Sequence, residues 1–166
     1  MATWSLGSPV YYGINGGLNF RNVDFSFVFS GNLRNKIYNA KKQLRTTNTD
    51  NVEASFANDR WTASNPSNTT PSALTQGMPN STFFLEKGDY LRLTNLVLGY
   101  TVPVTALEKA HLASVRIYAA AQNVFTATKY TGFTPELAGG PLDSGIEAST
   151  YPTSRTVTVG LNVNFK

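Results

Sequence analysis

Glu86 and Asp89 are the two carboxylates whose spacing comes nearest to a general acid and base pair. Such a pair can cleave a glycosidic bond when one carboxyl is protonated and the other is ionised. A solvated strand edge explains these two residues more simply, because no other catalytic group accompanies them. The chain has no cysteine and a single histidine, His111, which excludes a disulfide scaffold, a cysteine zinc site and a cysteine nucleophile. We expect His111 to lie in an exposed turn.

Sequence motifs for enzyme chemistry are absent. The chain contains no Gly-x-Ser-x-Gly, no His-Glu-x-x-His and no phosphate-binding glycine motif. We therefore predict that it is not an enzyme, with no catalytic, cofactor-binding or metal-binding residues. Three aromatic residues, Tyr38, Trp61 and Tyr130, are able to stack on a sugar ring or contact a partner protein, although packing within a loop is the simpler role for each.

The net charge of +4 comes from scattered basic residues with one local excess. This excess comprises Arg34, Lys36, Lys41, Lys42 and Arg45. Asp50, Glu53 and Asp59 follow closely and weaken the positive field, so we interpret the segment as a solvated loop and exclude a nucleic-acid surface. Charged residues make up only 14% of the chain, against roughly 25% in soluble domains, and Ser, Thr and Asn take their place. The surface is therefore polar without being strongly charged.

Alternation of apolar and neutral polar residues predicts β-strands. It is clearest at the C-terminus, where Val157, Val159, Leu161, Val163 and Phe165 alternate with Thr, Gly and Asn. Phe25, Phe27 and Phe29 alternate with Asp and Ser in the same way, and residues 12–20 and 115–122 repeat the pattern. Each of these segments has one apolar face and one polar face.

The segment from Tyr90 to Thr101 changes parity in its middle. Leu93 belongs to one parity, whereas Leu96 and Leu98 belong to the other. One extra residue near Thr94 and Asn95, a β-bulge, would restore a single apolar face. The sequence thus predicts an all-β fold of about five antiparallel amphipathic strands, each about nine to twelve residues long, which matches the length of strands that cross a bilayer.

The predicted connections alternate between short and long. Two are short, and the long ones cover about 33–82 and 126–154. Compact soluble domains rarely carry loops beyond about 15 residues, whereas transmembrane barrels have short periplasmic turns and long extracellular loops. We therefore treat residues 1–166 as a single segment with two extracellular loops. Neither a signal peptide nor an apolar stretch long enough for a membrane-spanning helix is evident.

Several short sequence motifs along the chain resemble the C-terminal end of the SusC/RagA-type TonB-dependent outer-membrane transporters. Their order and spacing match over nearly the whole chain. The motifs are Gly31-Asn32, Asn35 to Asn39, Arg60-Trp61-Thr62, Asn65-Pro66, Phe84 to Asn95, Leu98 to Pro103, Ala121 to Thr126 with Tyr130, Gly132 and Pro135, then Tyr151-Pro152, Arg155-Thr156 and Gly160 to Val163.

This resemblance implies the C-terminal part of a large, roughly 22-stranded transmembrane β-barrel in the outer membrane of a Gram-negative, Bacteroidota-like bacterium. It implies uptake of oligosaccharides or peptides, with the segment itself structural. The implied partners are the remainder of the barrel and its plug, TonB, a SusD-like surface lipoprotein that covers the barrel, the barrel assembly machinery and outer-membrane lipid. We expect no plug domain within these 166 residues, and TonB would act through the N-terminal part of such a receptor.

Within this interpretation the apolar strand residues face lipid. They are Phe25, Phe27, Phe29, Val157, Val159, Leu161 and Val163. By resemblance, Phe165 would be the barrel-assembly signal, although Lys166 follows it where such barrels commonly end on an aromatic residue. Arg92 and Arg116 would face the lumen and bond to the plug or to water.

Two alternatives remain open at this level. A soluble β-sandwich that binds carbohydrate would use Trp61 and tyrosines as a stacking platform, and it would turn the apolar faces of two sheets inward. A small barrel closed by oligomerisation would share its strands among several chains. Long strands with one-sided long loops favour the transporter segment over the sandwich, and the odd strand count does not exclude the shared barrel.

Overall fold

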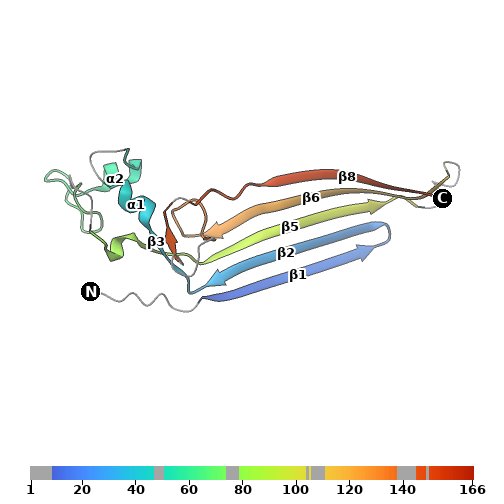
Figure 1. Ribbon diagram of the computed structural model, residues 1–166, viewed down its shortest axis with the longest axis horizontal. Coiled ribbons are helices and arrows are strands. Elements are labelled where there is room, and N and C mark those ends of the chain that lie inside the picture. Colours follow the sequence, from blue (N-terminus) through green and yellow to red (C-terminus); the bar gives the residue numbers. More distant parts are fainter. Residues whose placement is uncertain are drawn as a thin grey trace. The chain divides into compact units, whose positions relative to one another are not determined.

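The computed structural model describes residues 9–46, 51–73, 79–103, 105, 111–137, 145–148 and 150–166. These residues belong to two compact units. Figure 1 labels most of their helices and strands. We call residues 9–33, 89–129 and 153–166 the strand unit. The loop unit consists of the described residues within 34–88 and 130–152. Parts of the two predicted loops, residues 47–50, 74–78, 138–144 and 149, lie outside the described residues.

The strand unit is a single five-stranded sheet in the order β1-β2-β5-β6-β8, and all neighbours are antiparallel (Figure 1). This confirms the predicted all-β class and the predicted number of strands in this sheet. The strands are β1 Val10–Phe20, β2 Val23–Leu33, β5 Tyr90–Thr101, β6 Leu112–Thr128 and β8 Thr156–Phe165.

A two-residue turn connects β1 to β2, because Phe20 pairs with Val23. Arg21 adopts a φ of 53°, in the left-handed region that so tight a turn requires, and its guanidinium lies 5.3 Å from the centre of the Phe20 ring. The carbonyl of Asn22 accepts a hydrogen bond of 2.8 Å from the backbone N–H of Thr101. The turn is therefore tied to the neighbouring strand of the sheet.

The predicted bulge in β5 is present. Leu93 pairs with Phe29 on one side and Phe125 on the other, and the next paired residue is Asn95. Thr94 is thus the extra residue, and its hydroxyl lies 2.6 Å from that of Ser30. The insertion resets the alternation, so Leu93, Leu96 and Leu98 all lie on one face of the sheet.

The register places the apolar residues of all five strands on the same face. One cross-strand row runs through Leu18, Phe25, Leu98, Ala119 and Val159. The next row with the same orientation contains Phe27, Leu96, Ala121 and Val157. Because side chains alternate along a strand, the seven residues predicted to meet lipid, and Phe165 with them, share this apolar face.

The loop unit has a small sheet of its own, in the order β4-β3-β7. Strand β3 (Lys36–Asn39) is antiparallel to β4 (Leu85–Lys87) and parallel to β7 (Ile146–Glu147). The helical elements are α1 (Ala40–Leu44), α2 (Ala54–Asp59) and the 3-10 helix η1 (Thr82–Phe84). The side chain of Asn39 caps α1 by accepting a 2.8 Å hydrogen bond from the N–H of Lys42.

A few apolar side chains form a small core in the loop unit. Ile37 and Phe84 are fully buried, and Phe56 is nearly so. Tyr38, Ala73 and Phe83 pack against Phe56 and Phe84. The two predicted loops thus form a small packed structure, because β3 from the first pairs with β7 from the second. Among the described residues, no helix is long and apolar enough to cross a membrane.

Candidate functional site

The apolar face of the strand unit is exposed in this chain. Val159 is 74% exposed and Phe165 is 77% exposed. A row of rings follows β2 and continues onto β6, with centroids 6.0 Å apart for Phe25 and Phe27, 5.7 Å for Phe27 and Phe29, and 6.2 Å for Phe29 and Phe125. No charged residue of the five described strands lies on this face. An exposed, uncharged apolar face of this extent requires a covering environment.

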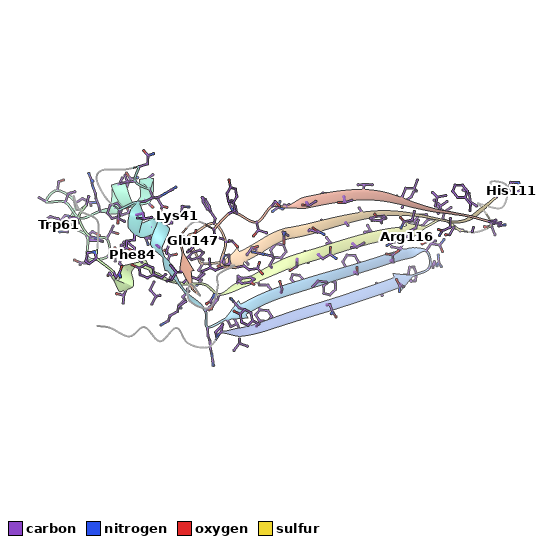
Figure 2. All side chains as sticks on the ribbon, viewed as in Figure 1. Lys41, Trp61, Phe84, His111, Arg116 and Glu147 are labelled. Carbon is purple, nitrogen blue, oxygen red and sulfur yellow. The ribbon has the colours of Figure 1, made fainter. Side chains whose placement is uncertain are left out.

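The opposite face of the sheet is polar and carries an ion pair. Arg116 on β6, labelled in Figure 2, donates from Nε to the Asp24 carboxylate on β2 at 3.0 Å. Its Nη2 bonds to the second carboxylate oxygen. The pair spans β5 at Gly99, where an added Cβ would overlap both charged groups. Glycine is therefore required at this position for the two side chains to meet. Arg92 on the same face donates from Nε to the Thr126 hydroxyl at 2.9 Å.

Glu86 organises polar contacts in the loop unit. Its carboxylate accepts hydrogen bonds from the Thr131 N–H at 2.9 Å and from the Asn39 side chain at 3.3 Å, and it forms an ion pair of 3.3 Å with Lys42. The side chain is only 12% exposed. The solvated strand edge expected from the sequence is therefore wrong for Glu86, because residues far away in the chain surround its carboxylate.

Tyr130 and Glu147 form a buried pair in the loop unit. The Tyr130 hydroxyl donates to Oε2 of Glu147, whose side chain is fully buried. Burial raises the pKa of Tyr130 above its usual value, and the hydrogen bond to Glu147 and the negative charge of that carboxylate raise it further. The Tyr130 ring is 6% exposed, so its role here is to join the start of the second loop to β7.

The other two aromatic candidates differ in exposure. Tyr38 packs beside the Phe84 ring, and its hydroxyl lies 2.8 Å from Oε1 of Gln43, the acceptor of its proton. Burial raises the pKa of Tyr38. Trp61 is 46% exposed, and its backbone N–H donates to the Thr70 carbonyl at 3.1 Å. Of the three candidates, Trp61 therefore presents the most accessible ring (Figure 2).

The loop unit also contains a cleft of about 570 Å³. Its lining combines two cations, two aromatic rings and small or apolar residues. These are Lys41, Leu44, Arg45, Phe133, Ala148, Thr150, Tyr151 and Pro152. Sequence reasoning noted Lys41 and Arg45 only as part of a weak basic excess, and it gave Phe133 no role and Tyr151 none beyond the family resemblance. No signal in the sequence connects residues 41–45 with residues 133–152.

The basic excess separates into different environments. Lys41 places its ammonium 3.1 Å from the centre of the Phe133 ring, whereas Lys42 pairs with Glu86. Arg34 and Lys36 are exposed and do not line the cleft. His111, in the strand unit, lies exposed in a turn with a φ of 55°. Among the described residues, no group of three or more His, Asp or Glu side chains is arranged to hold a metal ion.

Comparison with known proteins identifies the family. No family model matches the sequence. The chain is 30% identical to TonB-dependent receptor P26 of Formosa agariphila over 174 aligned residues, which cover 96% of this chain and 18% of that receptor. It is also 30% identical to TonB-dependent receptor SusC of Bacteroides thetaiotaomicron, over 94% of this chain and 15% of SusC. A solved structure of the RagAB peptide importer in its open-open state superposes with a TM-score of 0.77 and 26% identity, over 93% of this chain and 17% of that one.

The chain belongs to the SusC/RagA type of TonB-dependent receptors. It spans about one sixth of the length of the relatives it matches. The five-stranded sheet is therefore a segment of a SusC/RagA-type barrel, and its apolar side chains do not form the inward-facing core of a sandwich. The matched relatives are receptors and transporters, and nothing in the comparison favours a soluble carbohydrate-binding module.

Proposed function

We propose that this segment forms part of the lipid-facing wall of an outer-membrane transporter that takes up oligosaccharides or peptides. The observation that carries the proposal is the uncharged apolar face, which continues in register across all five strands. Charged side chains at the lipid surface of a barrel are costly. In a closed barrel, the outer edges of β1 and β8 would each pair with a further strand of the receptor. The seven apolar residues from Phe25 to Val163 would contact lipid.

The polar face would line the interior of the barrel. Its residues are mostly Asn, Ser, Thr and Gly, and two of its three charges neutralise each other in the Asp24–Arg116 pair. A plug held in the lumen would meet hydrogen-bonding groups with little net charge. Uptake energised by TonB would use parts of the receptor outside this chain.

The loop unit would lie on the extracellular side, beneath a SusD-like surface lipoprotein. Support comes from the similarity to SusC and to the RagAB peptide importer. Trp61 is the exposed loop aromatic best suited to contact the lipoprotein. Phe165, exposed at the end of β8, would be read by the barrel assembly machinery.

Spin-label accessibility tests the lipid-facing assignment. The chain has no cysteine, so single cysteines at Val159 and Thr158 can carry a nitroxide in a full receptor that lacks other cysteines. We expect oxygen, which concentrates in lipid, to relax the label at 159 more than a water-soluble nickel chelate does. The label at 158 should show the reverse. Equal access of the nickel chelate to both positions would overturn the proposal.

A further inference from the structure

The cleft of the loop unit has a lining that favours a charged sugar. Its two cations, Lys41 near the start of α1 and Arg45 at its C-cap, are four residues apart, so both lie on one side of that helix. Lys41 is visible on α1 in Figure 2. No acidic side chain is among the described residues that line the cleft. The described part of the lining therefore carries a positive charge that no described acidic group in it balances.

Two exposed rings stand in the same cleft. Phe133 is 55% exposed and Tyr151 is 90% exposed, although both are large aromatic residues. Flat rings of this kind stack against the C–H faces of a pyranose, and a tyrosine hydroxyl can bond to sugar hydroxyls. A volume of about 570 Å³ is large enough for a short oligosaccharide.

The ammonium of Lys41 already contacts one of these rings. It lies 3.1 Å from the centre of the Phe133 ring, which holds the cation at the wall of the cleft. Arg45 presents a planar guanidinium, which binds carboxylate and sulfate groups through paired hydrogen bonds. The neighbouring Lys42 differs, because its charge is neutralised by Glu86.

We propose that this cleft binds an oligosaccharide that carries carboxylate or sulfate groups. The inference rests on the proposed function and narrows its cargo to an anionic saccharide. Lys41 and Arg45 bind the acidic groups, while Phe133 and Tyr151 bind the sugar faces. A peptide fits less well, because the described lining offers no acidic group for an amino terminus or a lysine side chain.

Calorimetry on the full receptor in detergent tests this assignment. The probes are an oligogalacturonate, a sulfated carrageenan oligosaccharide and a neutral malto-oligosaccharide of equal length, with hexaglutamate and inorganic sulfate as further ligands. We expect one or both charged saccharides to bind at least about tenfold more tightly than the neutral one. The carboxylated and sulfated probes separate the two sources of negative charge.

Paired variants assign the binding to the cleft. The double variant Lys41→Gln/Arg45→Gln should lose about tenfold or more in affinity for the preferred charged saccharide. Arg34→Gln/Lys36→Gln removes the same charge from exposed positions outside the cleft and should leave the affinity nearly unchanged. Tyr151→Ala should weaken all saccharides, whereas Trp61→Ala, at an exposed ring outside the cleft, should not.

Several outcomes would overturn the inference. One is that charged saccharides bind no more tightly than the neutral one. Another is that the variants within and outside the cleft lose equal affinity, either the two double variants or Trp61→Ala and Tyr151→Ala. The last is that hexaglutamate or sulfate binds as tightly as the charged saccharide. The heat-dependent migration of a folded barrel on a gel checks assembly separately. If the receptor assembles in the outer membrane but does not prefer charged saccharides, only the saccharide-binding role of the cleft is refuted. If the receptor never assembles there, the proposed function is refuted.

Discussion

The strand unit and the loop unit bury their apolar residues in opposite ways. In the strand unit, Leu18 and Val159 lie on an open face and are largely exposed, whereas in the loop unit Ile37 and Phe84 are fully buried. Both units are built from the same chain. The difference shows that an apolar residue is not buried by its type alone, because its exposure depends on whether another element packs against its face.

Polar groups follow the same division. The loop unit holds its segments together with buried or nearly buried carboxylates, Glu147 and Glu86. The strand unit relies on backbone ladders, with the Asp24–Arg116 pair across its polar face. A substitution of one kind should therefore have different consequences in the two units, and the following changes test that contrast.

A lysine on the apolar face should have the largest effect. Val159→Lys is expected to destabilise the folded receptor by about 2–4 kcal/mol, because the charge would enter lipid. Thr158→Lys, one residue earlier on the polar face, should cost less than about 1 kcal/mol. Urea unfolding of the receptor in lipid vesicles measures both. Similar costs for the two variants would mean that the two faces meet the same solvent.

Removal of the Tyr130 hydroxyl should loosen the loop unit. Tyr130→Phe leaves the buried Glu147 without this hydrogen-bond donor, at a cost of about 1–3 kcal/mol. Tyr38→Phe, in the same unit, removes a hydroxyl from a part-buried site and should cost less. Hydrogen exchange followed by mass spectrometry should report faster exchange in residues 130–137, with β1 and β2 unchanged. Faster exchange across the whole five-stranded sheet would show instead that this hydrogen bond also stabilises the strand unit.

High pH should loosen the same region. The pKa of Tyr130 is raised above its usual 10.0 by burial and by Glu147. Its stabilising effect is therefore complete below pH 10 and decreases as pH rises further, because the unfolded phenol ionises first. Cleavage of the loop unit by subtilisin should accelerate above pH 10 in the wild type. Tyr130→Phe should reduce this acceleration but keep the part that comes from Tyr38, whose pKa is also raised. An identical rise in the variant would show that Tyr130 is not the group responsible.

Gly99→Ala should have a smaller effect, confined to the polar face. The new methyl group would overlap the Asp24 and Arg116 side chains and force their ion pair apart, which should lower the free energy of unfolding slightly. Gly13→Ala is the matched control, because its added Cβ would lie 3.7 Å from the nearest atom, the Phe29 carbonyl oxygen. Urea unfolding should separate the two variants. Equal stability would show that the pair rearranges without loss.

Trp61→Ala should have the smallest effect on stability. The ring is 46% exposed, and its backbone hydrogen bond to Thr70 does not depend on the side chain. We expect a change within about 0.5 kcal/mol, as for other surface substitutions. Phe25→Ala, which removes a ring from the aromatic row of the strand unit, should cost more. A larger loss at Trp61 would indicate packing against a part of the receptor beyond this chain.

Local pattern was enough to predict the sheet. Alternation within residues 156–165 and 23–33 identifies strands, and the parity change at Thr94 identifies the bulge, because both signals lie in contiguous residues. The long connections were located, but their internal structure was not predicted. Ile37 and Phe84 lie in short apolar clusters without a regular period, so nothing local showed that they would share a buried unit.

The candidate cleft could not be predicted from local sequence patterns either, because its lining residues are far apart in the chain. Lys41 and Arg45 were visible as a basic excess, but Phe133 and Tyr151 come from the other long connection. Glu86 was misjudged as solvated, because its partner Thr131 is 45 residues away. Trp61 is predicted from its type and position to contact a ligand or partner, and its exposed ring is consistent with that role.

The sequence by itself determined the strands, their apolar and polar faces, the bulge in β5 and the resemblance to SusC/RagA-type receptors. These properties depend on alternation and order within short segments, which the chain encodes directly. Only the tertiary structure decided which residues of the two long connections meet. Pairing of β3 with β7, the Tyr130–Glu147 hydrogen bond and the cleft beside α1 all join residues that are far apart in the chain. Such contacts depend on the packing of the whole loop unit, which no short segment specifies.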